Sequence, residues 1–165
     1  MLPTPTHPHR FRLSLLFLCA LSALVQAEEP LTPINSGGSW VYSTVGTFHD
    51  VKADLVQAIE SRGIVISYTA HAANMLQRTA DAVGALGKTY KNADILLFCK
   101  ADLTYHLTLK NPHNLSLCPY SVSIYTLATD WEAVYLSIRA PNPSVPEYQP
   151  VHDLLVEIVT DTISW

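Results

Sequence analysis

Apolar residues recur from residue 40 onward at spacings that predict alternating strands and helices. Short runs of β-branched and aromatic residues predict strands, and apolar residues four apart predict helices between them. The predicted strands are Trp40–Val45, Ile64–Tyr68, Ala93–Cys99, Tyr120–Leu127 and Ala133–Ile138, and the predicted helices are 48–62, 70–84, 101–110 and 151–163. The run Ile64–Tyr68 is β-branched and compact, which favours a central strand.

The ends of two predicted helices carry recognisable signals. Thr47 and Asp50 form an approximate capping box ahead of the first helix. Gly63 is a suitable stop after it, because glycine accepts a left-handed backbone. Pro112 ends the third helix, because proline disfavours helical geometry in the residue before it. The second helix is expected to turn Leu76, Ala80 and Val83 inward.

The order strand–helix–strand–helix–strand–helix–strand–strand–helix predicts an α+β fold in a single two-layer domain. We expect one five-stranded mixed or antiparallel sheet, with helices 48–62, 70–84 and 151–163 packed on one face. The sequence leaves open whether the other face is exposed to solvent or covered by a second copy in a homodimer.

The N-terminal segment has the pattern of a signal peptide. Basic residues precede a twelve-residue apolar stretch, Leu13–Leu24, and small residues follow at Val25 and Ala27. That stretch is too short to span a bilayer as a helix, so we expect cleavage and no stable membrane anchor afterwards. The predicted organisation is a signal peptide at 1–27, a flexible lead-in at 28–39 and one α+β domain at 40–165. The protein is therefore expected to be exported, to the periplasm or the medium.

Charge excludes some classes of partner. The chain has 10 Lys+Arg against 14 Asp+Glu, a formal charge of −4, and loss of Arg10 and Arg12 with the signal peptide makes it more acidic still. A nucleic-acid-binding protein normally shows a basic stripe, and none is present. A negative chain is also disfavoured on anionic membranes.

Two cysteines remain in the predicted mature chain, and their positions allow several roles. Cys99 ends a strand just before a helix, where the helix dipole favours a thiolate. Cys118 begins the next strand 19 residues later, so the two can meet if these strands are antiparallel neighbours. A structural disulfide, with Cα atoms about 4.4–6.8 Å apart, is the leading interpretation. Free core thiols, a redox pair and metal ligation stay open.

A second candidate site combines His71, Met75, Cys99 and His106. His71 and Met75 are four residues apart and share a helix face, and His106 follows Cys99 by two helical turns. Imidazole, thioether and thiolate are ligands that copper or haem iron accepts. Ordinary core packing explains a methionine or a lone histidine equally well.

No hydrolase, nucleotide-binding or zinc-protease motif is present in the sequence. We therefore favour a ligand-binding module for a metal or haem, with its site near these four residues, over an enzyme. A thiol redox or sulfur-handling protein that uses Cys99 and Cys118 is the main alternative. A structural or partner-binding domain without a small ligand is the third.

Several of these stretches together resemble the domain-of-unknown-function 302 (DUF302) family. The paired motifs Phe98-Cys99 and Cys118-Pro119 are the specific part of the resemblance. The other matching positions are His71, Met75, Leu76, Arg78, Thr79, Gly84, Tyr90, Ala93, Leu103, His106, Pro112, Asn114, Leu117, Tyr120 and Tyr125. The resemblance implies a compact two-layer α/β domain and supplies no catalytic residue. Shorter members read Pro-Cys where this chain reads Cys118-Pro119.

Overall fold

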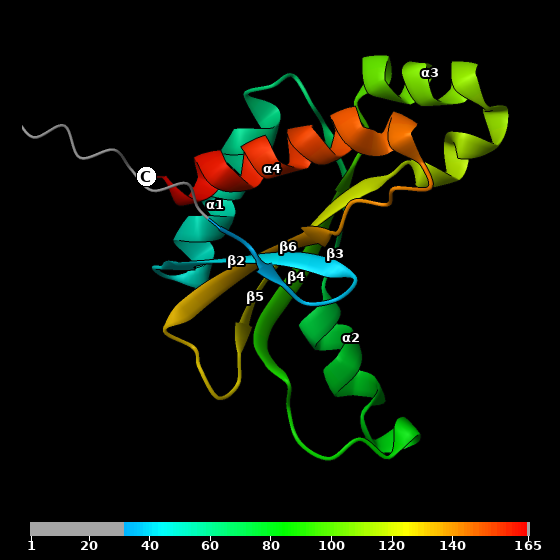
Figure 1. Cartoon of the computed structure of the whole chain (residues 1–165). Coiled ribbons are helices and arrows are strands. Elements are labelled where there is room, and N and C mark those ends of the chain that lie inside the picture. The colour runs from blue at the N-terminus through cyan, green and yellow to red at the C-terminus, as the bar shows by residue number, and fades with distance from the viewer. Residues whose placement is uncertain (1–31, 165) are drawn as a thin grey trace, which may run out of the picture. The chain divides into compact units, whose positions relative to one another are not determined.

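The computed structural model describes residues 32–164, so the predicted signal peptide at 1–27 lies outside the described residues. These residues form one sheet with four α-helices (Figure 1). The strands are β1 (Ile34–Asn35), β2 (Ser39–Val45), β3 (Ile66–Ala70), β4 (Tyr90–Phe98), β5 (Tyr120–Leu127) and β6 (Ala133–Arg139). The helices are α1 (Phe48–Glu60), α2 (Ala72–Thr79), α3 (Ala101–Lys110) and α4 (Gln149–Ile163), with 3₁₀ turns at Asp81–Val83, Pro112–Leu117 and Pro146–Tyr148.

The predicted α+β fold with one sheet is confirmed, with two corrections to the sheet. The strand order is β1-β2-β6-β5-β4-β3, and every neighbouring pair is antiparallel. The sheet has six strands rather than five, because Ile34–Asn35, in the predicted flexible lead-in, pairs with β2. The strand after Gly63 is an edge strand and not a central one. It runs from Ile66 to Ala70, two residues later than predicted, and Tyr68 on it is largely exposed.

One face of the sheet carries the hydrophobic core. Alternate residues of the central strands point to this face, as Leu96 and Phe98 of β4 and Val122 and Ile124 of β5 do. Helices α1 and α4 cover them, and their core residues are Val51, Leu55, Ala58 and Ile59 in α1 and Val151, Leu154, Leu155, Ile158 and Val159 in α4. These two helices were predicted to pack on one face, and they do.

Helix α1 begins at the predicted residue and ends at Glu60, two residues before the predicted end. Thr47 is the N-cap residue, and its hydroxyl accepts a hydrogen bond from the Asp50 amide at 3.1 Å and donates one to the Asp50 carboxylate at 2.7 Å. After the helix, Gly63 has a φ of +70°, a backbone conformation that residues with a Cβ rarely adopt.

The prediction for the second helix is wrong in two respects. Helix α2 is shorter than the predicted 70–84, and it has no buried residue. It also does not lie on the core face with α1 and α4. Its neighbour Ile95 alternates with the core residues of β4 and therefore points to the opposite face. Leu76 and Val83, expected to face inward, are exposed.

Helices α2 and α3 lie at opposite ends of the sheet (Figure 1). Helix α2 follows the end of β3, where Ala70 pairs with Ile95, and α3 follows the other end of β4, beyond Phe98. Within the described part of the chain, no helix has the length and apolar character needed to cross a membrane.

Candidate functional site

An open groove lies beside helix α2 and contains the polar groups that we consider the candidate site. It has a volume of about 870 Å³. The residues that line this α2 groove are Tyr68, Ala70, His71, Ala72, Asn74, Met75, Gln77, Arg78 and Ile95. Its walls therefore combine apolar surface with an imidazole, a guanidinium and two amides.

His71 is held at the entrance of α2 by a buried carboxylate. Its Nδ1 lies 2.8 Å from Oδ1 of Asp94, whose side chain is only 11% exposed. The ε-ammonium of Lys52, from α1, donates to the other oxygen of Asp94 at 2.6 Å. The Asp94 carboxylate of β4 thus joins a side chain of α1 to the residue that precedes α2.

The charge of Asp94 determines which nitrogen of His71 is available. Burial acts to raise the pKa of Asp94, but its hydrogen bonds to Lys52 and His71, together with their charges, outweigh burial and hold the pKa below its ordinary value. An ionised carboxylate only accepts hydrogen bonds, so Nδ1 of His71 carries the hydrogen. Nε2 is then the ring nitrogen left for a ligand, on a side chain that is 60% exposed.

The electrostatic character of the groove favours an anionic group. Arg78 and His71 are among its lining residues, and no acidic residue is. Asp94 lies behind His71 and is already paired with Lys52, so its negative charge is largely offset. A carboxylate or similar group that enters the groove would find a guanidinium without an opposing acid in the lining.

The structure brings two of the four predicted metal-site residues into this groove and places the other two elsewhere. His71 and Met75 both line it. Cys99 and His106 lie at the α3 end of the sheet. Cys99 follows Asp94 by five residues, which is about 17 Å of extended strand, and His106 lies further along the chain. Sequence spacing placed His71 and His106 on helix faces but could not show that their helices leave the sheet at opposite ends.

Among residues 32–164, no group of three or more histidine, cysteine, aspartate or glutamate side chains is placed to hold a metal ion. Because Cys99 and His106 lie at the α3 end of the sheet and Cys99 is bonded to Cys118, the four residues predicted from the sequence do not form one shared site. Any metal in the α2 groove would depend on His71 and Met75, with Asp94 behind the imidazole.

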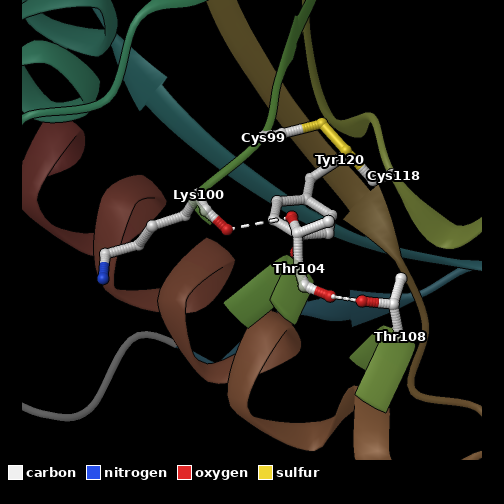
Figure 2. Close-up of a disulfide and its surroundings, with 6 residues drawn as sticks. All are labelled: Cys99, Lys100, Thr104, Thr108, Cys118 and Tyr120. Carbon is white, nitrogen blue, oxygen red and sulfur yellow. Dashed lines mark hydrogen bonds between the residues drawn. A yellow bond between two sulfur atoms is a disulfide. The ribbon is translucent and has the colours of Figure 1, made fainter. Parts of the chain in front are cut away.

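The two cysteines form a disulfide at the α3 end of the sheet (Figure 2). Their Cα atoms are 5.9 Å apart, inside the range predicted from the sequence. Phe98, the last residue of β4, and Tyr120, the first residue of β5, are register partners. This pairing brings the nearby Cys99 and Cys118 together. Beside the disulfide, Thr104 contacts the Tyr120 hydroxyl at 3.1 Å and donates to the Lys100 carbonyl at 2.9 Å.

The two sulfur-bearing residues differ in their surroundings. Cys118 packs against the hydrophobic core. Cys99 lines a second, smaller groove of about 290 Å³, which we call the α3 groove. The other lining residues of the α3 groove are Ala101, Thr104, Tyr105, Thr108 and Leu115.

Asp94 and Lys52 are the residues of the candidate site that sequence reasoning missed. Asp94 was included in an apolar strand, where one acid among six apolar neighbours was a usable signal, since a buried carboxylate needs a partner. Lys52 lies in the predicted helix 48–62. Nothing in the spacing linked it to Asp94, 42 residues away.

Comparison with known proteins adds a fold but no activity. No protein-family model matches the chain, and no curated protein matches it either. A solved structure described as the uncharacterized conserved protein DUF302 from Bacillus stearothermophilus superposes with a TM-score of 0.62. The match covers 77% of this chain and 99% of that one at 11% identity. At this identity it shows that the two chains share a fold, which agrees with the resemblance seen in the sequence.

Proposed function

We propose that this chain, which shares the fold of a DUF302 protein, is an exported ligand-binding member of that family. Its binding site is the α2 groove, and His71 is the central group. The observation that carries the proposal is the hydrogen bond between His71 Nδ1 and the buried Asp94 carboxylate. It fixes the imidazole and leaves Nε2 for a ligand.

The same arrangement is typical of histidines that bind metals. Such a histidine usually donates its second ring N–H to a carboxylate, which orients the ring and raises its basicity. A single imidazole is enough to hold haem iron on one side. A bare cation is less well suited, because Arg78 lines the same groove.

Haem is therefore the ligand that the groove fits best. The volume of about 870 Å³ lies within the usual range for organic ligands. Met75, Ile95 and the ring of Tyr68 supply apolar surface, and Arg78 can pair with a propionate. Copper(I) held by His71 and Met75 is the second candidate, because a thioether and an imidazole one helical turn apart suit a soft ion.

Titration of the purified protein with haemin, followed by absorption spectroscopy, tests the proposal. We expect a shifted Soret band with the wild type, no such band with His71→Ala, and weaker binding with Arg78→Ala. His106→Ala is the matched control, because His106 is exposed on α3 at the other end of the sheet, and it should bind as the wild type does.

Copper(I) is tested in parallel with a competing chelator. If copper(I) binding requires both His71 and Met75 and haemin gives no shifted Soret band, the ligand of the groove is copper(I) rather than haem. If His71→Ala binds haemin as well as the wild type and no variant binds copper, the proposal fails and a structural or partner-binding role takes its place.

A further inference from the structure

The disulfide at the α3 end has features of an exchangeable bond rather than of a buried structural disulfide. Both cysteines are half-buried, and Cys99 lines the open α3 groove while Cys118 packs against the core. A thiolate that enters the α3 groove therefore meets Cys99, whereas Cys118 lies on the side of the bond that faces the core. Figure 2 shows the bond beside the Tyr120 ring, at the point where the chain enters α3.

The sheet holds the two cysteines together whether or not they are bonded. Phe98 at the end of β4 and Tyr120 at the start of β5 are register partners. Cys99 directly follows Phe98 in the chain, and Cys118 lies two residues before Tyr120. The core on this face includes both Phe98 and Tyr120. Reduction would therefore leave the two thiols close to each other, ready to form the bond again without unfolding.

The position of Cys99 also favours its thiolate. The residue precedes α3, a helix of ten residues whose N-cap residue, Lys100, makes no side-chain capping bond. The partial positive charge of the helix start stabilises a sulfur anion there. The Asp102 carboxylate in the first turn accepts a hydrogen bond from the Leu103 amide. The negative charge of Asp102 is offset by an ion pair with Lys100.

We propose that the Cys99–Cys118 disulfide is a thiol–disulfide exchange site, separate from the α2 groove, with thiols of the same compartment as its substrates and Cys99 as the sulfur that they attack. A substrate thiolate bonds to Cys99 Sγ, the bond between the two cysteines breaks, and Cys118 leaves as a thiolate that takes up a proton. A second substrate thiolate then attacks the substrate sulfur of the mixed disulfide. Cys99 leaves as a thiolate. Two thiols are oxidised to one disulfide, and the protein disulfide is reduced to a dithiol.

Glutathione is the probe for the test. The wild type is incubated in buffers of reduced and oxidised glutathione, then alkylated and analysed by mass spectrometry, and near-UV circular dichroism follows its tertiary structure. We expect reduction and reoxidation to be reversible, with the folded signal retained in the dithiol form. A disulfide that opens only when denaturant unfolds the protein would overturn the proposal.

Single-cysteine variants identify the reacting sulfur. Cys118→Ala leaves Cys99, and we expect it to form a mixed disulfide with oxidised glutathione about five- to tenfold faster than the matched variant Cys99→Ala, because a thiolate-rich, accessible sulfur reacts faster. Thermal melts verify that both variants are folded. If one of them does not fold, a quenched time course of wild-type reduction identifies the first cysteine glutathionylated. Equal rates, or first reaction at Cys118, would contradict the assignment.

Discussion

The buried ring of His152 stands edge-on to Trp40, with ring centroids 4.6 Å apart and planes at 87°. His152 lies on the core side of α4 and is only 2% exposed. Neither of its ring nitrogens has a hydrogen-bond partner among the described residues. An imidazole in this setting is held neutral, because burial lowers the pKa of His152 and the opposing effect of Asp153 is smaller.

The first prediction is that His152 makes the protein less stable in mild acid. Its lowered pKa means that the unfolded chain binds more protons than the folded one just below about pH 6.5, so the free energy of unfolding falls as the pH drops through that range. His152→Phe should remove this part of the pH dependence and raise stability by about 1–3 kcal/mol, because an unpaired buried polar group is lost.

Urea unfolding at about pH 7.5 and about pH 5.5 measures this effect. His113→Phe, at an exposed position, is the control and should keep the pH dependence of the wild type. A His152→Phe protein that loses as much stability in acid as the wild type would show that other groups cause the loss.

The second prediction concerns the carboxylate that joins Lys52 to His71. Asp94→Asn should lower the free energy of unfolding by about 1–3 kcal/mol, because Lys52, with a side chain 29% exposed, loses its charged partner. Since the pKa of Asp94 is lowered in the folded state, its contribution is present above about pH 4 and is lost as the pH falls through the folded-state pKa.

A double-mutant cycle with Lys52→Met measures the interaction energy between Asp94 and Lys52 apart from their other contacts. We expect a coupling energy of about 0.5–3 kcal/mol at neutral pH, which disappears in acid as Asp94 becomes protonated. Additive effects of the two substitutions would mean that the ion pair contributes nothing to stability.

The third prediction tests the start of α1. Thr47→Ala removes the hydroxyl that caps the Asp50 amide, and we expect it to cost about 1 kcal/mol of stability. Thr129→Ala, at an exposed turn position, should have almost no effect in the same chemical denaturation experiment. Thr47→Ser retains the hydroxyl and should recover most of the loss.

Local signals predicted much of this fold because they depend on neighbouring residues alone. The cap at Thr47, the stop at Gly63 and the end of α3 before Pro112 all lie where the sequence indicated. The disulfide was the leading interpretation of the two cysteines, because a strand end and the next strand start can meet if the strands are antiparallel neighbours, as β4 and β5 are. The sheet order could not be read in this way, because apolar composition does not distinguish the edge strand β3 from a central strand.

The candidate site was predicted only in part, for a related reason. Its helical pair, His71 and Met75, has a spacing that can be recognised in the sequence. The contacts of His71 with Asp94 and of Asp94 with Lys52 depend on the packing of α1 against the sheet and on the course of the chain after β3. Spacing also suggested that α2 and α3 share a site, whereas the direction of β4 separates them.

The last prediction compares two leucines on different helices, one buried and one exposed. Leu107 of α3 is 1% exposed and packs in the core, whereas Leu76 of α2 is 44% exposed. Leu107→Ala should cost about 2–5 kcal/mol, because it removes buried surface and leaves a cavity. Leu76→Ala, the same chemical change, should alter stability by less than about 0.5 kcal/mol. Chemical denaturation at low and high protein concentration measures both values. A large, concentration-dependent cost for Leu76→Ala would contradict the exposed position and indicate that α2 is covered by a second copy in solution.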